Sequence, residues 1–286
     1  MDYSTGRVRV AAISFLNPAP LLWDFEHGPR AIRLRERYDV SYTLPSHCAA
    51  QLRRGDADLG LIPIAALATL PNVRAVPGCT IASLQEVRSI QLVLKPGIRL
   101  QTAAAIAVDA ASRSSAAYLN VILKTFYGAQ PKLEEHTVNL SDMLHQCDGA
   151  LLIGDPALLA LQLRDEEGAF EDCTWIDLAA LWRQHTGLPW VAAVWAVRMD
   201  VFDRRGTTPQ QLCKDLIASR DGGLKNIDTL VEEWQPRLAL PAGAIRGYLS
   251  SNIHYRLDEP CLQGIDTFFR LAEAAAVLPR YRLQLL

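Results

Sequence analysis

An asparagine stands in an unusual setting near the N-terminus, in the segment ISFLNPAPLLW at residues 13–23. Asn17 lies between Leu16 and Pro18, shortly after an apolar run that predicts a strand. Prolines remove N–H donors and fix the backbone, so the Asn17 amide, which donates and accepts, could face a ligand. The alternative is an Asx turn that satisfies its own backbone. Spacing alone does not choose between these two interpretations, and Ser14 shares the segment.

A second polar group gathers in DAASRSSAAYL, residues 109–119. Here Ser112, Arg113, Ser114 and Ser115 crowd the start of a predicted helix. Exposed N–H groups, the helix dipole and hydroxyls together favour an anion, and an arginine adds a charge-assisted contact. Ordinary N-capping is the alternative, but one serine would satisfy it. The excess of hydroxyls therefore indicates an anion site.

Other polar residues stand where predicted strands begin or end. Ser83 and Ser89 flank the start of a strand, although serines in such places are mostly loop residues. In IGDPAL, Gly154 permits close backbone approach and could line a cleft with its N–H, whereas helix capping is the more natural role for Asp155. Thr186 directly precedes Gly187 and a strand that enters the expected hinge.

Composition and motifs exclude several classes of protein. The net charge is -2 and no basic stripe is visible, so no nucleic-acid partner is expected. The six cysteines and six histidines are scattered without CxxC or HxxxH pairs, so no metal site is expected. The first residues do not form a secretory signal, and no apolar stretch reaches the ~18 residues of a membrane span. We therefore expect a soluble, cytoplasmic protein without a membrane partner.

The elements that must position these residues alternate between strand and helix over the first 200 residues, which predicts an α/β fold with a largely parallel sheet. Two long strands, at 87–95 and 190–197, suggest that the chain crosses between two lobes and returns. We place lobe one at 1–90 plus 197–286 and lobe two at 91–196; one doubly wound sheet is the alternative. The other expected elements are strands at 8–13, 40–44 and 56–64, helices at 46–54 and 112–128, a strand, tight turn and helix within 149–163, and mostly helices after 199.

Five segments appear in an order and spacing that carry a family resemblance. They are ISFLNPAPL, LPSHCAAQLRRGDADLGLIPIAAL, DAASRSSAAYLNVILKTFYG, ALLIGDPAL and DLAALWRQHTGLPWVAAVWAVR. From about residue 8 to residue 198 the chain closely resembles the chorismate dehydratase family of the futalosine route to menaquinone. The resemblance implies a two-lobed, periplasmic-binding-protein-like (type II) fold with the ligand cleft between the lobes.

The resemblance also implies an activity, which is conversion of chorismate to 3-[(1-carboxyvinyl)oxy]benzoate with loss of water, without cofactor or metal. This reaction makes the protein a carbon–oxygen lyase whose partner is a small dicarboxylate. Its implied catalytic residues are Asn17 and the strand-end serine, either Ser83 or Ser89. The implied substrate-binding residues are Ser89, Arg113, Ser114, Ser115, Gly154 and Asp155. From their positions in the sequence we also expect Ser14 and Thr186 to bind substrate. The family motif SYLNT stands here as SFLNP, so two hydroxyls of that motif are missing.

No histidine or glutamate in the matching segments is a convincing base. Our hypothesis is therefore that the enolpyruvyl carboxylate of the substrate itself takes the proton from C3, oriented by Asn17. Two rivals remain: a 1,4-dihydroxy-6-naphthoate synthase of the same pathway, and a solute-binding protein without catalysis. The SFLN and LWRQHTGLPW patterns favour the dehydratase, and no export signal supports a solute receptor. A ligand-sensing regulator would need a DNA-binding segment, which we do not find.

Overall fold

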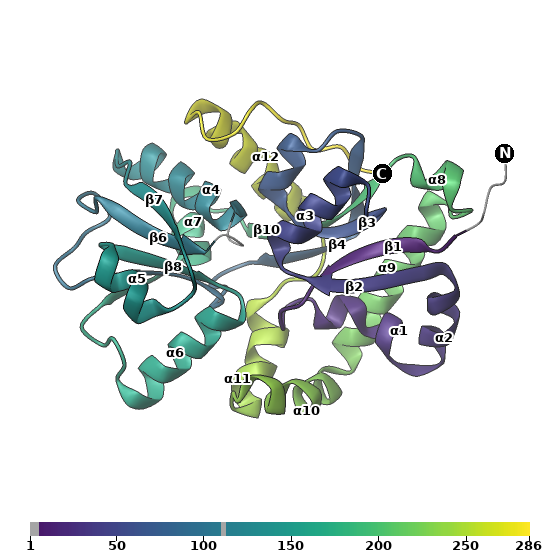
Figure 1. The fold of residues 1–286 in the computed structure, drawn as a ribbon, viewed down its shortest axis with the longest axis horizontal. Coiled ribbons are helices and arrows are strands. Elements are labelled where there is room, and N and C mark those ends of the chain that lie inside the picture. The colour runs from purple at the N-terminus through teal and green to yellow at the C-terminus, as the bar shows by residue number, and fades with distance from the viewer. Residues whose placement is uncertain (1–5, 110–112) are drawn as a thin grey trace.

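Two five-stranded sheets, each accompanied by helices, form the two lobes of this α/β protein (Figure 1). The computed structural model describes residues 6–109 and 113–286, except the side chain of Arg113. Ser112 therefore lies outside the described residues. The lobes lie side by side, and the chain passes between them at the centre of the molecule (Figure 1). The alternative of a single doubly wound sheet is wrong.

The first lobe has the strand order β2-β1-β3-β10-β4. Its strands are β1 (Val8–Ile13), β2 (Tyr38–Thr43), β3 (Leu59–Pro63), β4 (Val73–Ser83) and β10 (Trp190–Arg198). Its helices and turns, together with those of the C-terminal part, are η1 (Ala19–Leu22), α1 (Trp23–Glu26), α2 (Gly28–Arg37), α3 (Pro45–Arg54), η2 (Ile64–Thr69), α8 (Val201–Arg204), α9 (Pro209–Lys225), α10 (Ile227–Leu238), α11 (Ala242–Gly247), the π-helical turn η4 (Tyr248–Asn252) and α12 (Glu259–Ala274).

The second lobe has the strand order β7-β6-β8-β5-β9. Its strands are β5 (Ile90–Leu94), β6 (Ala105–Asp109), β7 (Lys132–His136), β8 (Gly149–Ile153) and β9 (Thr174–Asp177). Its helices are α4 (Arg113–Ile122), the π-helical turn η3 (Leu123–Tyr127), α5 (Leu140–Gln146), α6 (Asp155–Glu167) and α7 (Leu178–Thr186). All residues of β5 and β8 are buried, as their nearly continuous apolar sequences suggest.

Two expectations about the sheets are wrong. The strand expected at 190–197 in lobe two, within 91–196, pairs in the first sheet instead, antiparallel to β3 and β4. The sheets are also mixed and not largely parallel, because β5 likewise runs antiparallel to both its neighbours. The reason is where these strands start: Trp190 of β10 lies opposite Ser83, the last residue of β4. A strand that enters a sheet at the edge where its neighbours end must run the opposite way.

The unexpected strand β4 explains how the first sheet is completed. Its sequence, VRAVPGCTIAS, contains a Pro-Gly pair that is typical of a turn. Gly78 has a φ of 90° there, and the pairing of β4 with β10 shifts register nearby. The strand absorbs this irregularity and continues to Ser83 at the cleft. A bulge of this kind is invisible to a simple alternation pattern.

Stacked aromatic rings join the lobes behind the cleft. Tyr118 of α4 stacks on Trp190 of β10 at 3.7 Å and on Phe268 of α12 at 4.0 Å between ring centroids. All three side chains are fully buried. Since the three elements are far apart in sequence, this cluster fixes α4 against the crossing strand and the C-terminal helix. It thereby sets where the first turn of α4 lies.

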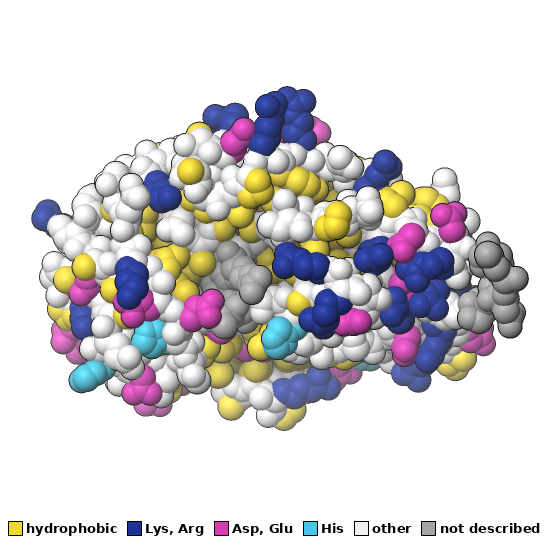
Figure 2. Space-filling view, turned by 45° about the horizontal axis from the view of Figure 1, so that its top comes forward, with side chains coloured by type: hydrophobic (Ala, Val, Ile, Leu, Met, Phe, Trp, Pro, Cys, Tyr) yellow, Lys and Arg dark blue, Asp and Glu magenta, His cyan; other side chains and the backbone are white. Residues whose placement is uncertain are grey.

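Several charged side chains of the first lobe form ion pairs, such as Arg7 with Asp39 and Arg54 with Asp56. Figure 2 shows Lys and Arg side chains gathered mostly over that lobe on the face in view. Inside the lobe, Asp58 is fully buried and forms ion pairs with Arg9, Arg204 and Arg205. Such pairing serves the structure of the lobe. No helix in the described part of the chain has the length and apolar character needed to cross a membrane.

Candidate functional site

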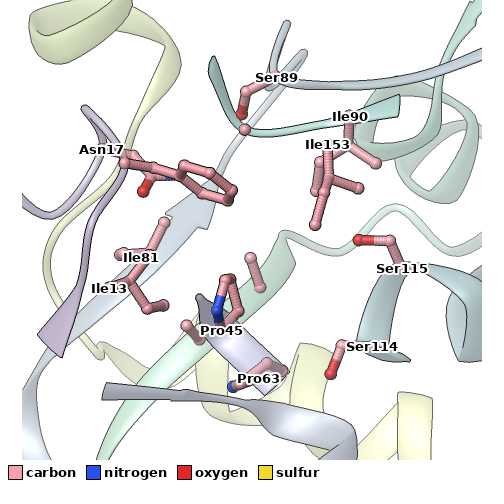
Figure 3. Close-up of a pocket in the computed structure, with 14 residues that line it drawn as sticks. Ile13, Asn17, Pro45, Pro63, Ile81, Ser89, Ile90, Ser114, Ser115 and Ile153 are labelled. Atoms are coloured by element: carbon pink, nitrogen blue, oxygen red, sulfur yellow. The ribbon is translucent and has the colours of Figure 1, made fainter. Parts of the chain in front are cut away.

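A pocket lies between the two lobes, where strands of both sheets begin or end (Figure 3). The empty space inside it is about 470 Å³ when the open solvent at its mouth is counted. The first lobe contributes Ile13, Phe15, Asn17, Pro45, Pro63, Ile81, Ala192 and Ala193, and the second contributes Ser89, Ile90, Ser114, Ser115, Ile153 and Gly154. Its polar side chains are one amide and three hydroxyls. No lining side chain that the structure describes is charged.

The backbone around Asn17 is held by the two prolines and by a close helix contact. Pro18 is the N-cap of η1 and Pro20 stands in its first turn. The turn packs on α9, where a Cβ atom on Gly223 would lie 2.2 Å from the carbonyl oxygen of Pro20. Only a glycine permits this approach. The chain therefore leaves β1 in one fixed conformation, with Asn17 at the pocket.

The amide of Asn17 is not used in a turn of its own. Its Oδ1 atom is buried and has no hydrogen-bond partner among the described residues. The Asx-turn interpretation is therefore wrong, since it requires that oxygen to accept from the local backbone. Figure 3 shows the side chain at the pocket wall, below Ser89. An unpaired buried acceptor is costly unless a bound molecule donates to it.

Ser83 and Ser89, which lie between β4 and β5 where the chain passes to the second lobe, have different surroundings. The Ser83 hydroxyl donates to the carbonyl of Glu86 at 2.8 Å and accepts from the N–H of Gln85 at 3.3 Å, so it stabilises the turn after β4. Ser83 is absent from the pocket lining, whereas Ser89 belongs to it and is 1% exposed. The pocket serine is Ser89, and the role expected for Ser83 is wrong.

The loop that presents Ser89 is anchored by a single carboxylate. Asp177 accepts from the N–H groups of Val87 and Arg88 and from the side-chain amide of Gln91. The same carboxylate caps α7. Arg88 has a φ of 59°, an uncommon conformation for a residue with a side chain. The anchor holds this strained residue, and with it the direction of the following serine.

At the start of α4, Ser114 and Ser115 are both buried and line the pocket. Ser114 accepts from the N–H of Ala65 at 2.9 Å, which ties the second lobe to η2 of the first. The oxygen of Ser115 is directed toward the pocket (Figure 3). Arg113 is the first residue of α4, and its side chain lies outside what the structure describes. Of the three expected residues, only Ser115 thus offers the pocket a hydroxyl without a hydrogen-bond partner among the described residues.

Three helices begin at the pocket. Pro45 is the first residue of α3, Ser114 and Ser115 stand in the first turn of α4, and Gly154 is the N-cap of α6. All four residues line the pocket. The positive ends of three helix dipoles therefore converge on a pocket without described charged side chains, which favours an anionic ligand.

The turn at the start of α6 connects the lobes. Gly154 has φ 63° and ψ -145°, and a Cβ atom there would lie 2.5 Å from the Phe15 ring. Its N–H donates to the carbonyl of Ser89, so the expectation that this N–H faces the cleft is wrong. The expectation that Asp155 caps its own helix is wrong. Its Oδ1 accepts from the N–H of Leu16 at 2.9 Å, across the lobes.

Burial raises the pKa of Asp155 to about 6, against the opposing effect of the hydrogen bond from Leu16. Since the usual aspartate pKa is about 4, the folded protein binds this proton more tightly than the unfolded chain. The resulting stability is present below pH ~4 and is lost as the pH rises through about 6.

Replacing Asp155 with asparagine should remove this dependence, because the amide stays neutral while its oxygen still accepts from Leu16. The free energy of unfolding of the variant should increase relative to that of wild type as the pH rises from about 4 to about 6, by at most roughly 3 kcal/mol. Urea unfolding across this pH range measures the difference. Asp266→Asn, at an exposed residue of α12, is the control. Parallel curves for wild type and Asp155→Asn would contradict the prediction.

Like Ser83 and Asp155, two further expected site residues are absent from the pocket lining. Ser14 is exposed and lines a neighbouring groove with Tyr42 and Arg237. The Thr186 hydroxyl donates to the carbonyl of Trp182, one turn earlier in α7, and accepts from the N–H of Leu188. It therefore closes the C-terminus of the helix. Both expectations rested on sequence proximity to other motifs, which does not fix where a side chain points.

The sequence analysis did not single out a buried tyrosine in the C-terminal part of the chain. Tyr248 is the first residue of η4 and is 3% exposed. The polar and charged groups that influence the pKa of its hydroxyl include Ser89, Asn17 and Asp155. Burial raises the pKa of Tyr248, so the hydroxyl stays neutral. A lone tyrosine among C-terminal helices carries no local motif.

Two side-chain groups elsewhere have the composition of metal ligands. They are Glu134, His136 and Cys147, and His254, Asp258 and Cys261, each with ligand atoms within 4.8 Å of one another. Neither group lines the pocket. In the second group, Asp258 caps α12 and binds His254 at 2.8 Å. In the first, Glu134 pairs with Lys132 at 3.1 Å. Protein partners thus occupy both carboxylates.

Comparison with known proteins places this geometry in context. A family model described as menaquinone biosynthesis matches residues 8–274. A chorismate dehydratase of Thermus thermophilus is 30% identical over 243 residues, which are 82% of this chain and 86% of that protein. Protein AF1704 of Archaeoglobus fulgidus has a solved structure with a TM-score of 0.70 at 16% identity, covering 97% of this chain and 100% of that one.

The fold itself is shared with more distant structures. The CA3427 gene product of Candida albicans, described as having the generic periplasmic binding protein fold, matches with a TM-score of 0.66 at 13% identity. The match covers 96% of this chain and 92% of that one. The expected two-lobed, periplasmic-binding-protein-like fold is confirmed.

Proposed function

The chain belongs to the menaquinone biosynthesis family, and on that premise we propose that it converts chorismate to 3-[(1-carboxyvinyl)oxy]benzoate with loss of water. The main support is the buried, unpaired Oδ1 of Asn17 in a pocket lined by hydroxyls and apolar side chains. Chorismate is a ring with two carboxylates and one hydroxyl, at C4. That hydroxyl is the only hydrogen-bond donor of the dianion, so it is the group that suits this oxygen.

The pocket has the electrostatics that a dianion requires. Helix N-termini and the hydroxyls of Ser89 and Ser115 can stabilise carboxylates without a cation in the described lining. The apolar side chains Ile13, Ile81 and Ile153 suit the faces of the ring. A low-dielectric surrounding also strengthens each hydrogen bond to a carboxylate and keeps bulk water from the reacting atoms.

The elimination then needs little from the protein besides position. The C3–H bond breaks first, and its electron pair is delocalised through the adjacent double bond into the ring carboxylate. The C4–O bond breaks next, the leaving hydroxide takes up the proton that came from C3 to form water, and the ring becomes aromatic. We propose that the enolpyruvyl carboxylate accepts the C3 proton. Asn17 orients the substrate, and hydroxyls stabilise the charge that grows on the ring carboxylate.

Incubation of the protein with chorismate tests the proposal. We expect an aromatic product that is lighter than chorismate by one water, detected by absorbance and mass spectrometry. The rate should be the same after dialysis against a chelator, because we also propose that no metal or cofactor takes part. Binding without turnover would instead indicate a solute-binding protein. No reaction and no binding would favour a later pathway step such as the 1,4-dihydroxy-6-naphthoate synthase.

A further inference from the structure

The segment that carries Asn17 makes few backbone hydrogen bonds before its prolines. The N–H of Ser14 donates to the carbonyl of Thr43 at 3.0 Å, where the pairing of β1 with β2 ends. Over residues 15–17, the N–H of Leu16 is the only one with a hydrogen-bond partner among the described residues. The partner of Leu16 is therefore what fixes the chain immediately before Asn17.

That partner is a carboxylate of the other lobe. Asp155, the first residue of α6, accepts the N–H of Leu16 with its Oδ1 atom at 2.9 Å. Leu16 is fully buried, so water cannot serve as an alternative acceptor for its N–H. A buried N–H without a partner is strongly unfavourable, and a carboxylate is a stronger acceptor than a neutral group. The contact between the lobes at this point therefore requires an acceptor on the side chain of Asp155.

The turn that presents Asp155 also holds the other polar side of the pocket. The N–H of Gly154 donates to the carbonyl of Ser89 at 2.8 Å, and a Cβ atom on Gly154 would lie 2.5 Å from the Phe15 ring. Two adjacent residues thus contact both segments whose side chains, Asn17 and Ser89, bring polar groups to the pocket (Figure 3). Because the turn is hydrogen-bonded to both segments, it sets how far apart these polar groups lie.

We propose that Asp155 is a positioning residue of this pocket, whose carboxylate holds the backbone of Leu16 and thereby sets where the Asn17 amide lies. The kinetic consequence rests on the proposed function, whereas the geometric content does not. Asp155 acts through the segment that it binds, since it is absent from the pocket lining. Donor and acceptor belong to different lobes, so the Asn17 segment is held in this way only while the lobes lie together.

Two substitutions of Asp155 test the proposal. Asp155→Ala removes the acceptor and should lower kcat for chorismate by about 10- to 100-fold, because the amide that orients the substrate is then no longer held. Asp155→Asn keeps an oxygen in the same place and should retain most of the wild-type kcat. Equal losses in the two variants would overturn the proposal, since the acceptor would then have no part in catalysis.

Asp142→Ala is the matched control. Asp142 also stands in the first turn of a helix of the second lobe, α5, but it is exposed and absent from the pocket lining. Its replacement removes the same favourable interaction with a helix dipole and should leave kcat unchanged. Thermal unfolding should show that all three variants are folded. If Asp142→Ala lowered kcat as much as Asp155→Ala, the loss would come from the helix start, which would contradict the proposal.

A double substitution separates positioning from a general structural role. If Asp155 acts through Asn17, then adding Asp155→Ala to Asn17→Ala should cost little beyond Asn17→Ala alone. Full additivity of the two losses would show that Asp155 acts independently of the amide, and it would refute the positioning role.

Hydrogen exchange keeps the proposal testable even if chorismate is not the substrate. The amide proton of Leu16 can be followed in protein labelled at the leucine nitrogens, and its resonance is identified by its loss in Leu16→Met. Its exchange should be slow in wild type and in Asp155→Asn, and at least about 10-fold faster in Asp155→Ala. Wild-type protection in Asp155→Ala would refute the positioning role. Lack of turnover by wild type together with the expected loss of protection would refute only the proposed function.

Discussion

Replacing Asn17 with alanine should lower kcat/KM for chorismate by about 100- to 1,000-fold, the usual cost of removing one preorganised polar group from an active site. The side chain supplies the only amide in the pocket lining, and its oxygen is buried without a partner among the described residues. Nothing else in the described lining can replace both its donor and its acceptor. Steady-state kinetics measure the loss, and thermal unfolding checks the fold.

Asn17→Asp should lose activity as well, for a different reason. A carboxylate at this position would face the two carboxylates of the substrate in a pocket of low dielectric, and it would offer no donor to either. The control is Ser14→Ala in the same loop, since Ser14 is exposed and lies outside the pocket. Near wild-type rates for both Asn17 variants would show that this amide does not position the substrate.

Replacing Gly154 with alanine should lower turnover nearly as much, because the backbone conformation and the surroundings of this residue both disfavour a Cβ atom. The backbone angles, φ 63° and ψ -145°, lie near a region that is essentially restricted to glycine. The added Cβ would also meet the Phe15 ring at 2.5 Å. Phe15 or the whole turn must move, and with it the contact between the lobes at the edge of the pocket. We expect turnover to fall about 100-fold or more, since small displacements of the site have effects of this size.

Gly187→Ala is the control that separates the effect of backbone strain from the effect of the steric clash with Phe15. Gly187 also has a positive φ, of 71°, but a Cβ atom there would have no neighbour within 4 Å. This control should lose about 1 kcal/mol of stability from strain, with kcat close to wild type. If Gly154→Ala kept wild-type turnover, the contact of Phe15 with this turn would have no part in shaping the site.

The sequence was sufficient for the features that local patterns encode. Strand 8–13 is confirmed at its predicted bounds, and Gly55 and Gly128 end their helical segments in the left-handed conformation, as expected. Periodicity and turn residues act over a few positions, so one segment carries the whole signal. The order of five motifs likewise identified the family and the two-lobed fold, because their spacing reflects a single topology.

Tertiary structure alone decided which polar groups meet. Ser83 and Ser89 look equivalent in sequence, yet one stabilises a turn and the other lines the pocket. Asp155 resembles a helix cap and instead binds Leu16 of the other lobe. Tyr248 gave no signal, although Asn17 and Ser89 both influence the pKa of its buried hydroxyl. The physical reason is that a hydrogen bond between distant segments depends on how two lobes pack, and no local pattern of residues carries that information.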